Sequence, residues 1–149
     1  MFRHILVPTD GSAVSTRAEK TAVDLAKKFR ARVTIVHVMP PYSPQRLGEI
    51  RGLGTEPLSK QEYEKVTEKR GKAAVRRVST RAKRAGVRHD VVLAMDDAPG
   101  DALVRTAGQN GCDLIVMASH SRVGIERIFL GSVASDVLSG TRIPVLVCH

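Results

Sequence analysis

Short aliphatic blocks alternate with segments of helical periodicity along the whole chain, and this alternation limits the possible folds most strongly. Four blocks are Ile5–Val7, Val33–Val38, Leu114–Met117 and Ile143–Val147. Continuous apolar runs of this length are typical of strands that are buried on both faces of a sheet. A weaker block from Val87 to Met95 includes charged residues, which indicates an edge strand.

The segments between the blocks carry apolar residues at steps of three and four, the spacing of one helix face. The first predicted helix contains Ala18, Ala22 and Ala26, and either Ser12 or Ser15 is expected to cap it. The other predicted helices run from near Ser59 to Gly86, from Pro99 through Ala107, and from Val133 to near Gly140.

Strands that alternate with helices predict an α/β fold with right-handed crossovers. We expect a doubly wound sheet of five mostly parallel strands, with four helices covering both faces. The chain of 149 residues suits a single domain. Its core must be aliphatic, because aromatic residues make up only 3% and tryptophan is absent. The segment from Met39 to Leu58 is rich in proline and glycine and is predicted to be a long loop that is functional or partly disordered.

Two segments are candidates for a ligand site, because doubly wound sheets bind ligands at the carboxyl ends of their strands. Pro8–Ser12 follows the first predicted strand, and Met117–Gly124 follows the fourth. The second segment leads to Gly131-Ser132 at a helix start, where backbone N–H groups and hydroxyls can bind phosphate. Asp10 would repel phosphates and is better suited to a ribose hydroxyl or a divalent metal. The alternative interpretation is that these residues only begin and cap helices.

These segments belong to a broader pattern, because the chain resembles the universal stress protein family from end to end. The resemblance implies a Rossmann-like fold, one domain over residues 1–149, a homodimer and a role in stress responses. It also implies adenine-nucleotide binding, since some members bind ATP. The resemblance is carried by Ile5–Ser12, Val36–Val38, Asp113–Met117, Gly131–Ala134 and Ile143–Val147.

ATP-binding members of the family carry a glycine, two residues, a glycine, nine residues, and a glycine followed by serine or threonine. In this chain that spacing falls on Ala118, Ser121 and Gly131, with Ser132 in the last place. A residue other than glycine costs about 1–2 kcal/mol in the left-handed region and brings a Cβ toward the phosphates. A serine hydroxyl can instead donate to a phosphate.

By this resemblance, ATP, with or without Mg²⁺, is the expected ligand. The residues predicted to bind the nucleotide are Pro8, Thr9, Asp10, Val38, Met117, Ala118, His120, Ser121, Gly131, Ser132 and Val133. We expect the nucleotide to order the segment from Ala118 to Leu130, with the segment from Met39 to Leu58 as a second candidate, and so to change the surface shown to an unidentified protein partner.

An enzymatic function is one alternative. Ser132, His120 and Asp10 could meet in the crevice as nucleophile, base and orienting group, or Asp10 could hold a metal. The sequence has no G-x-S-x-G elbow, no P-loop and no complete G-x-G-x-x-G motif. We therefore predict that the protein is not a dedicated enzyme, with slow ATP hydrolysis as the alternative.

Nucleic-acid binding through a basic helix is a second alternative. The segment from Lys60 to Arg84 has ten basic residues against three acidic ones, a local net charge of +7 within a chain of net charge +9. A solvated helix face explains this charge better than a nucleic acid, because neither a recognition motif nor an aromatic platform accompanies it. The same charge would also suit an acidic partner.

The remaining sequence features concern assembly and location. The aliphatic segment from Ile143 to Cys148 would leave an exposed sheet edge, so we expect a symmetric dimer through it. His37 and His120 fall near strand ends that face the crevice, but no histidine or cysteine spacing predicts a metal site. With no apolar leader and no membrane-length run, Cys112 and Cys148 are predicted to be reduced thiols in the cytoplasm.

Overall fold

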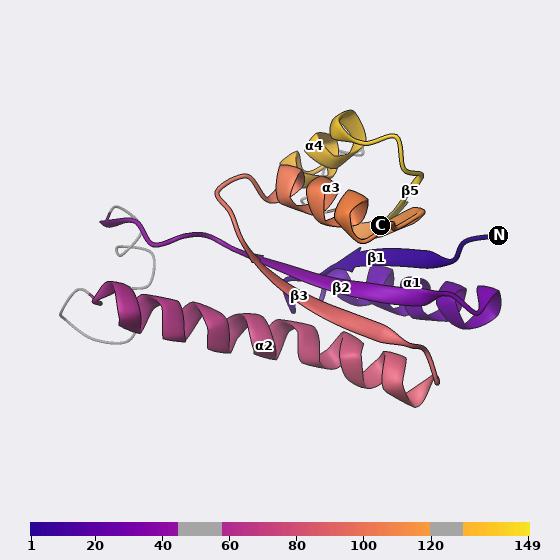
Figure 1. Ribbon diagram of the computed structural model, residues 1–149, viewed down its shortest axis with the longest axis horizontal. Coiled ribbons are helices and arrows are strands. Elements are labelled where there is room, and N and C mark those ends of the chain that lie inside the picture. Colours follow the sequence, from indigo (N-terminus) through magenta and orange to yellow (C-terminus); the bar gives the residue numbers. More distant parts are fainter. Residues whose placement is uncertain (45–57, 120–129) are drawn as a thin grey trace.

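The computed structural model describes residues 1–44, 58–119 and 130–149 of the chain. It contains five strands and four helices in the described part, in the alternating order that the sequence predicts (Figure 1). In chain order these are β1 (His4–Pro8), α1 (Ser15–Phe29), β2 (Arg32–Met39), α2 (Lys60–Arg84), β3 (His89–Met95), α3 (Pro99–Gln109), β4 (Leu114–Ala118), α4 (Ser132–Gly140) and β5 (Val145–Cys148).

The strands form one parallel sheet in the order β3-β2-β1-β4-β5. The chain starts in the middle of this sheet, builds toward β3, and then crosses back to β4 and β5. The change of direction falls between β1 and β4, which is the topological switch point of a doubly wound fold. The predicted architecture is confirmed, and β3 lies at an edge as its charged residues indicated.

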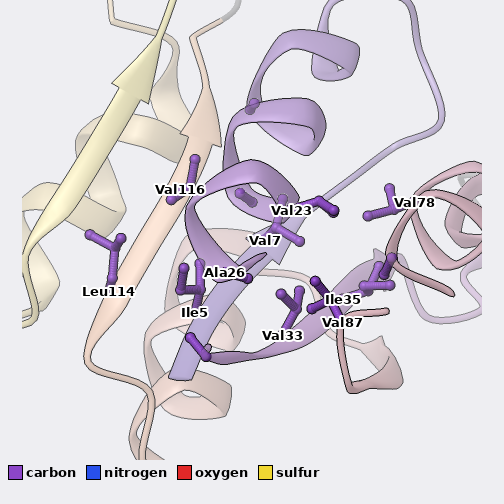
Figure 2. Packing of buried hydrophobic residues seen from close by; sticks show 14 of the residues in the cluster. Ile5, Val7, Val23, Ala26, Val33, Ile35, Val78, Val87, Leu114 and Val116 are labelled. Carbon is purple, nitrogen blue, oxygen red and sulfur yellow. The ribbon is translucent and has the colours of Figure 1, made fainter. Parts of the chain in front are cut away.

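Alternate residues of the strands pack against different helices, so the sheet has a core on each face. Ile5 and Val7 of β1 pack on the side of α1 and α2, whereas Leu6 packs on the side of α3 and α4. Figure 1 shows α2 on one side of the sheet and α3 and α4 on the other. Figure 2 shows the first core, in which side chains of α1 meet those of the strands. Both cores consist almost entirely of aliphatic side chains, as the composition requires.

The predicted cap of α1 is wrong. The helix follows Val14, which has helical dihedral angles, and no side chain caps it. Ser15 is the first helical residue, and its hydroxyl is bound by Glu19 and by the carbonyl of Ser12. Both bonds are local, and Arg77 of α2 also donates to this hydroxyl, so the Ser15 hydroxyl is engaged elsewhere and does not cap the helix. By contrast, Ser59 caps α2 in a complete capping box with Glu62.

One strand boundary needs adjustment, and one predicted segment lies largely outside the described residues. The last strand begins at Val145 instead of Ile143, because Pro144 has no N–H to donate and contributes only its carbonyl, which accepts from Ile115. The predicted loop from Met39 to Leu58 falls largely on residues 45–57, outside the described residues. No helix in the described ranges is long and apolar enough to span a membrane.

Gly11, in the loop between β1 and α1, lies against the backbone of α2. Its φ of +77° is in the left-handed region, and a Cβ there would approach the Cα of Ala74 to 2.9 Å. Gly86 has a similar φ of +71°, but a Cβ there would meet nothing within 4 Å. Of these two glycines, Gly11 alone combines a left-handed backbone with a steric requirement.

We expect Gly11→Ala to destabilise the protein more than Gly86→Ala. Both substitutions carry the left-handed penalty of about 1–2 kcal/mol, and Gly11→Ala adds an overpacking cost of about 1–3 kcal/mol against α2. Chemical denaturation of the two variants measures the difference. Equal losses of stability in the two variants would show that the β1–α1 loop can move away from α2 without a free-energy cost.

Candidate functional site

A cleft opens at the carboxyl ends of the central strands, on the edge where β1 and β4 separate. The two strands pair only at Ile5 with Leu114 and at Leu6 with Ile115, whereas β1 and β2 stay paired through Pro8. Beyond the short β1–β4 ladder lies a cleft of about 270 Å³. This is where a doubly wound sheet is expected to bind a ligand.

Every predicted site residue within the described part of the chain lines this cleft. They are Pro8, Thr9, Asp10, Val38, Met117, Ala118, Gly131, Ser132 and Val133. The ends of β1, β2 and β4 and the first turn of α4 contribute them, so segments far apart in the sequence meet at one place. The predicted residues His120 and Ser121 lie outside the described residues.

The cleft also contains residues that were not in the predicted set: Ser15, Val36, His37, Pro99, Leu103 and Ala134. His37 and Pro99 had a sequence signal, because each stands at or just beyond the end of a predicted strand. Leu103 carried no comparable signal, since a leucine on a helix face is an ordinary core residue.

The first turn of α4 presents backbone N–H groups to the cleft. Gly131 is the N-cap, with an extended backbone at φ −60° and ψ 156°, and no side chain caps the helix. The carbonyl of Gly131 accepts the first helical bond, from the N–H of Ser135. The close packing of α3 on α4 fixes this helix, because a Cβ on Gly100 would come within 2.5 Å of the Cβ of Asp136. An uncapped helix start of this kind favours an anion.

Asp10 is the one carboxylate among the described residues that line the cleft. It is exposed, and its Oδ1 accepts a hydrogen bond of 2.9 Å from the backbone N–H of Ser12. His37 donates from Nδ1 to the carbonyl oxygen of Thr9 at 2.8 Å, because a carbonyl can only accept. The neutral ring of His37 therefore carries its proton on Nδ1 and leaves Nε2 as an acceptor.

A buried carboxylate, Glu19 of α1, holds the loop that forms one wall of the cleft. The Glu19 side chain is 0% exposed. Its Oε1 accepts from the hydroxyls of Thr9 at 2.6 Å and Ser15 at 2.8 Å, both of which line the cleft. Arg77 of α2 binds both carboxylate oxygens at 2.8 Å and also donates to the carbonyl of Ser12. This network ties the β1–α1 loop to the long helix.

The network sets the charge state of Glu19. Burial by itself raises the pKa of a carboxyl, but the hydrogen bonds from Arg77, Thr9 and Ser15 outweigh it and lower the pKa of Glu19. The hydrogen bond to Glu19 likewise raises the pKa of Arg77. Both groups are therefore charged at neutral pH, and their ion pair is bidentate.

Two other observations concern the chemistry of the described residues. Burial raises the pKa of the Cys112 thiol to about 11, so this thiol is neutral and unreactive at physiological pH. Both cysteines are free. Within residues 1–44, 58–119 and 130–149, no group of three histidine, cysteine, aspartate or glutamate side chains is placed to hold a metal ion.

We expect Arg77→Gln to be more destabilising than Glu19→Gln at pH 7. Arg77→Gln leaves a fully buried carboxylate without its cation, at a cost of about 3–5 kcal/mol. Glu19→Gln leaves a guanidinium that is 39% exposed and can be hydrated, so about 1–3 kcal/mol is lost. Urea denaturation of both variants compares the two losses.

The pH dependence of the stability provides the control for this comparison. Because the folded pKa of Glu19 is lowered, its stabilising contribution is complete above the unfolded value near 4.5 and is lost as the pH falls through the folded pKa. The wild type should therefore lose stability more steeply than Glu19→Gln below about pH 4.5. Parallel curves would contradict a stabilising role for the charged carboxylate.

Comparison with known proteins places this fold and cleft in a family. The model of the universal stress protein family matches residues 1–149. A protein of Methanocaldococcus jannaschii named as a universal stress protein is 33% identical over 147 residues, which cover 99% of this chain and 82% of the relative. The solved structure of UspA from Lactobacillus plantarum is similar in fold, with a TM-score of 0.76 at 22% identity over 99% of this chain and 97% of that one.

A further similarity is to a solved universal stress protein in complex with cAMP. It is 28% identical, with a TM-score of 0.64, and the match covers 99% of this chain and 97% of that one. Matches by sequence and by structure thus extend over essentially the whole chain, including every strand end and the helix start that form the cleft. This chain belongs to the universal stress protein family.

Proposed function

We propose that this protein binds an adenine nucleotide, with ATP as the ligand, in the cleft between β1 and β4, and acts in stress responses by conformation and partner binding. The observation that carries the proposal is the uncapped start of α4, which opens into an otherwise largely apolar cleft. The relative that is 28% identical and was solved with cAMP supports the choice of an adenine nucleotide.

The lining of the cleft fits the parts of such a ligand. Pro8, Val38 and Met117 offer apolar surface to a base, and Asp10 can accept from a ribose hydroxyl. The N–H groups at Gly131 and Ser132 and the Ser132 hydroxyl are suited to phosphate oxygens. Any Mg²⁺ would be held chiefly by the phosphates, with Asp10 as the nearby carboxylate.

The loss of glycine at the first motif position does not count against this proposal. Ala118 lies in β4, and among the described residues Arg30 is the only one other than glycine with a positive φ. Ala118 therefore carries no left-handed strain. Compared with glycine, it only adds a methyl group at this position.

We propose that the nucleotide acts as a switch and that turnover is not its main consequence. Ala118 and Gly131 both line the cleft, so the chain segment between them begins and ends at the ligand site. A bound nucleotide can therefore bias the arrangement of this segment, and with it the surface available to a partner. Slow ATP hydrolysis is the alternative, and a fall in the ATPase rate with Asp10→Ala at unchanged ATP binding would favour it.

The two free thiols support a reducing compartment such as the cytoplasm.

Gly131→Asp tests the phosphate end of the cleft. Aspartate is a better N-cap than glycine, and the φ of −60° suits any residue, so the variant should fold at least as stably as the wild type. The new carboxylate would occupy the helix N–H groups and repel phosphates, so we expect ATP affinity to fall by at least about tenfold. Native mass spectrometry and calorimetry with ATP and Mg²⁺ measure both the bound mass and the affinity.

Gly131→Asn is the matched control, because asparagine caps the helix without a charge. It should lose clearly less affinity for ATP than Gly131→Asp does. If the wild type binds no adenine nucleotide at millimolar ATP, or if Gly131→Asp binds as well as the wild type, the proposed site is wrong.

We also propose a homodimer through β5, the strand at one edge of the sheet. Leu146 of this strand is 39% exposed, which makes the edge both open and apolar. Such an edge is prone to pair with another chain, and a two-fold axis would pair it with its own copy.

Leu146→Lys should convert the dimer to a monomer at about micromolar concentration, because it places a charge in the centre of the shared apolar contact. Val91→Lys is the control, since Val91 is 44% exposed on β3 at the opposite edge and should leave the dimer intact. Sedimentation velocity distinguishes the outcomes. A monomeric wild type would refute the dimer.

A further inference from the structure

A second hollow lies away from the cleft, between the helices α1 and α2. Its polar lining consists of Arg76, Arg77, Thr80, Arg81 and Arg84 from α2, with Asp24 from α1. Cationic side chains dominate this groove, whereas the cleft at the strand ends is mostly apolar. The described residues that line the cleft and those that line this groove do not overlap.

Three of the four arginines that line the groove have no ion-pair partner among the described residues, and Arg77 is the exception. Arg77 is paired with Glu19. Within the described part of the chain, no ion pair or hydrogen bond is formed by the side chains of Arg76, Arg81 and Arg84. The other acidic residues of α2 are already engaged, since Glu64 pairs with Lys60, Glu68 with Lys72, and Glu62 with the Ser59 cap. Asp24 is therefore the only carboxylate opposite these arginines in the described lining.

Arg81 carries the most specific signal. Its Nε is buried and has no hydrogen-bond partner among the described residues. Native proteins rarely leave a buried donor unsatisfied, and a bound ion or water is a common reason for such a group. Arg81 lines the groove, so the outer N–H groups of its guanidinium can donate to phosphate oxygens, and a ligand that draws the side chain outward would also give Nε a partner.

The spacing of the arginines favours a chain of phosphates over a single ion. Arg76, Thr80 and Arg84 are four residues apart along α2, and such residues share one helix face at intervals of about 6 Å. A neighbouring hollow, lined by Lys65, Lys69, Lys72 and Glu68, shares Arg76 with the groove. Positive charge therefore continues along the helix beyond the groove.

The walls of the groove indicate a slender ligand without aromatic groups. Helix α1 closes one side, and no aromatic residue is in the described lining, so there is no surface on which a base would stack. We propose that the groove between α1 and α2 binds consecutive phosphate groups of a linear inorganic polyphosphate through Arg76, Arg81 and Arg84. Thr80 donates its hydroxyl to the same chain, and Asp24 limits the affinity by repulsion.

The test uses the full chain and inorganic tripolyphosphate, with a longer polyphosphate as a second probe, in calorimetry at constant ionic strength. The double variant Arg81→Gln and Arg84→Gln should bind at least about tenfold more weakly, because two charge-assisted contacts are lost. Arg142→Gln is the control matched in charge to the single variant Arg84→Gln: it removes one positive charge from an exposed site after α4 and should bind like the wild type. Asp24→Asn should bind more tightly.

Two further variants distinguish binding in the groove from binding in the cleft. Gly131→Asp, which blocks the phosphate end of the cleft, should leave polyphosphate binding in the groove unchanged, so that failure of one proposal is distinct from failure of the other. Arg84→Gln alone changes only an exposed side chain and is the second variant if the double variant does not fold.

Three results would overturn the proposal. If Arg142→Gln weakened polyphosphate binding as much as Arg84→Gln does, the ligand would be bound by diffuse surface charge. If Gly131→Asp were the one variant that weakened it, the phosphates would bind in the cleft. Tighter binding of single-stranded DNA than of polyphosphate, with the same dependence on Arg81 and Arg84, would show that the ligand class is wrong.

Discussion

Parallel pairing of the strands is the constraint on which the rest of this structure depends. Parallel strands cannot be joined by tight turns, so each connection crosses a face of the sheet and brings a helix with it. From β1 the chain builds toward one edge of the sheet, and from β4 it builds toward the other edge. The connections that leave β1 and β4 therefore run apart from each other. The cleft is the consequence, since the strand ends on either side of the reversal lead to helices on opposite faces. Its location thus follows from topology before any particular side chain is considered.

The second feature on which the structure depends is the ion pair between the buried carboxylate of Glu19 and the partly exposed guanidinium of Arg77. The two residues are 58 positions apart, and their contact joins the first helix, the second helix and the loop that carries Thr9 and Asp10. A charge that is 0% exposed needs several donors, and here the donors are the same hydroxyls that line the cleft. The wall of the cleft and the packing of α2 are therefore stabilised by one network. Arg77 also borders the basic groove, so the cleft and the groove lie on the two sides of the same ion pair.

The candidate site was largely predictable because its residues stand at strand ends and at a helix start. Pro8, Ala118 and Gly131 could be assigned to one edge of the sheet from the order of the elements alone. The contribution of Leu103 could not, because its role depends on how α3 packs above the sheet. Glu19 left a weaker signal: it interrupts the small apolar face that contains Ala18, Ala22 and Ala26, but its partner on a distant helix cannot be identified from spacing.

By itself, the sequence determined the order and type of the elements, the aliphatic core and the edge of the sheet at which the candidate cleft lies. These features are local or follow from general rules, since periodicity, chain length and the handedness of crossovers need no long-range contacts. Tertiary structure alone decided that Arg77 would bind Glu19 and Ser15, that Gly11 would be required by the backbone of α2, and that the basic face of α2 would border a groove. Each of these depends on a close contact between distant segments, and the distances involved are set only when both cores are packed.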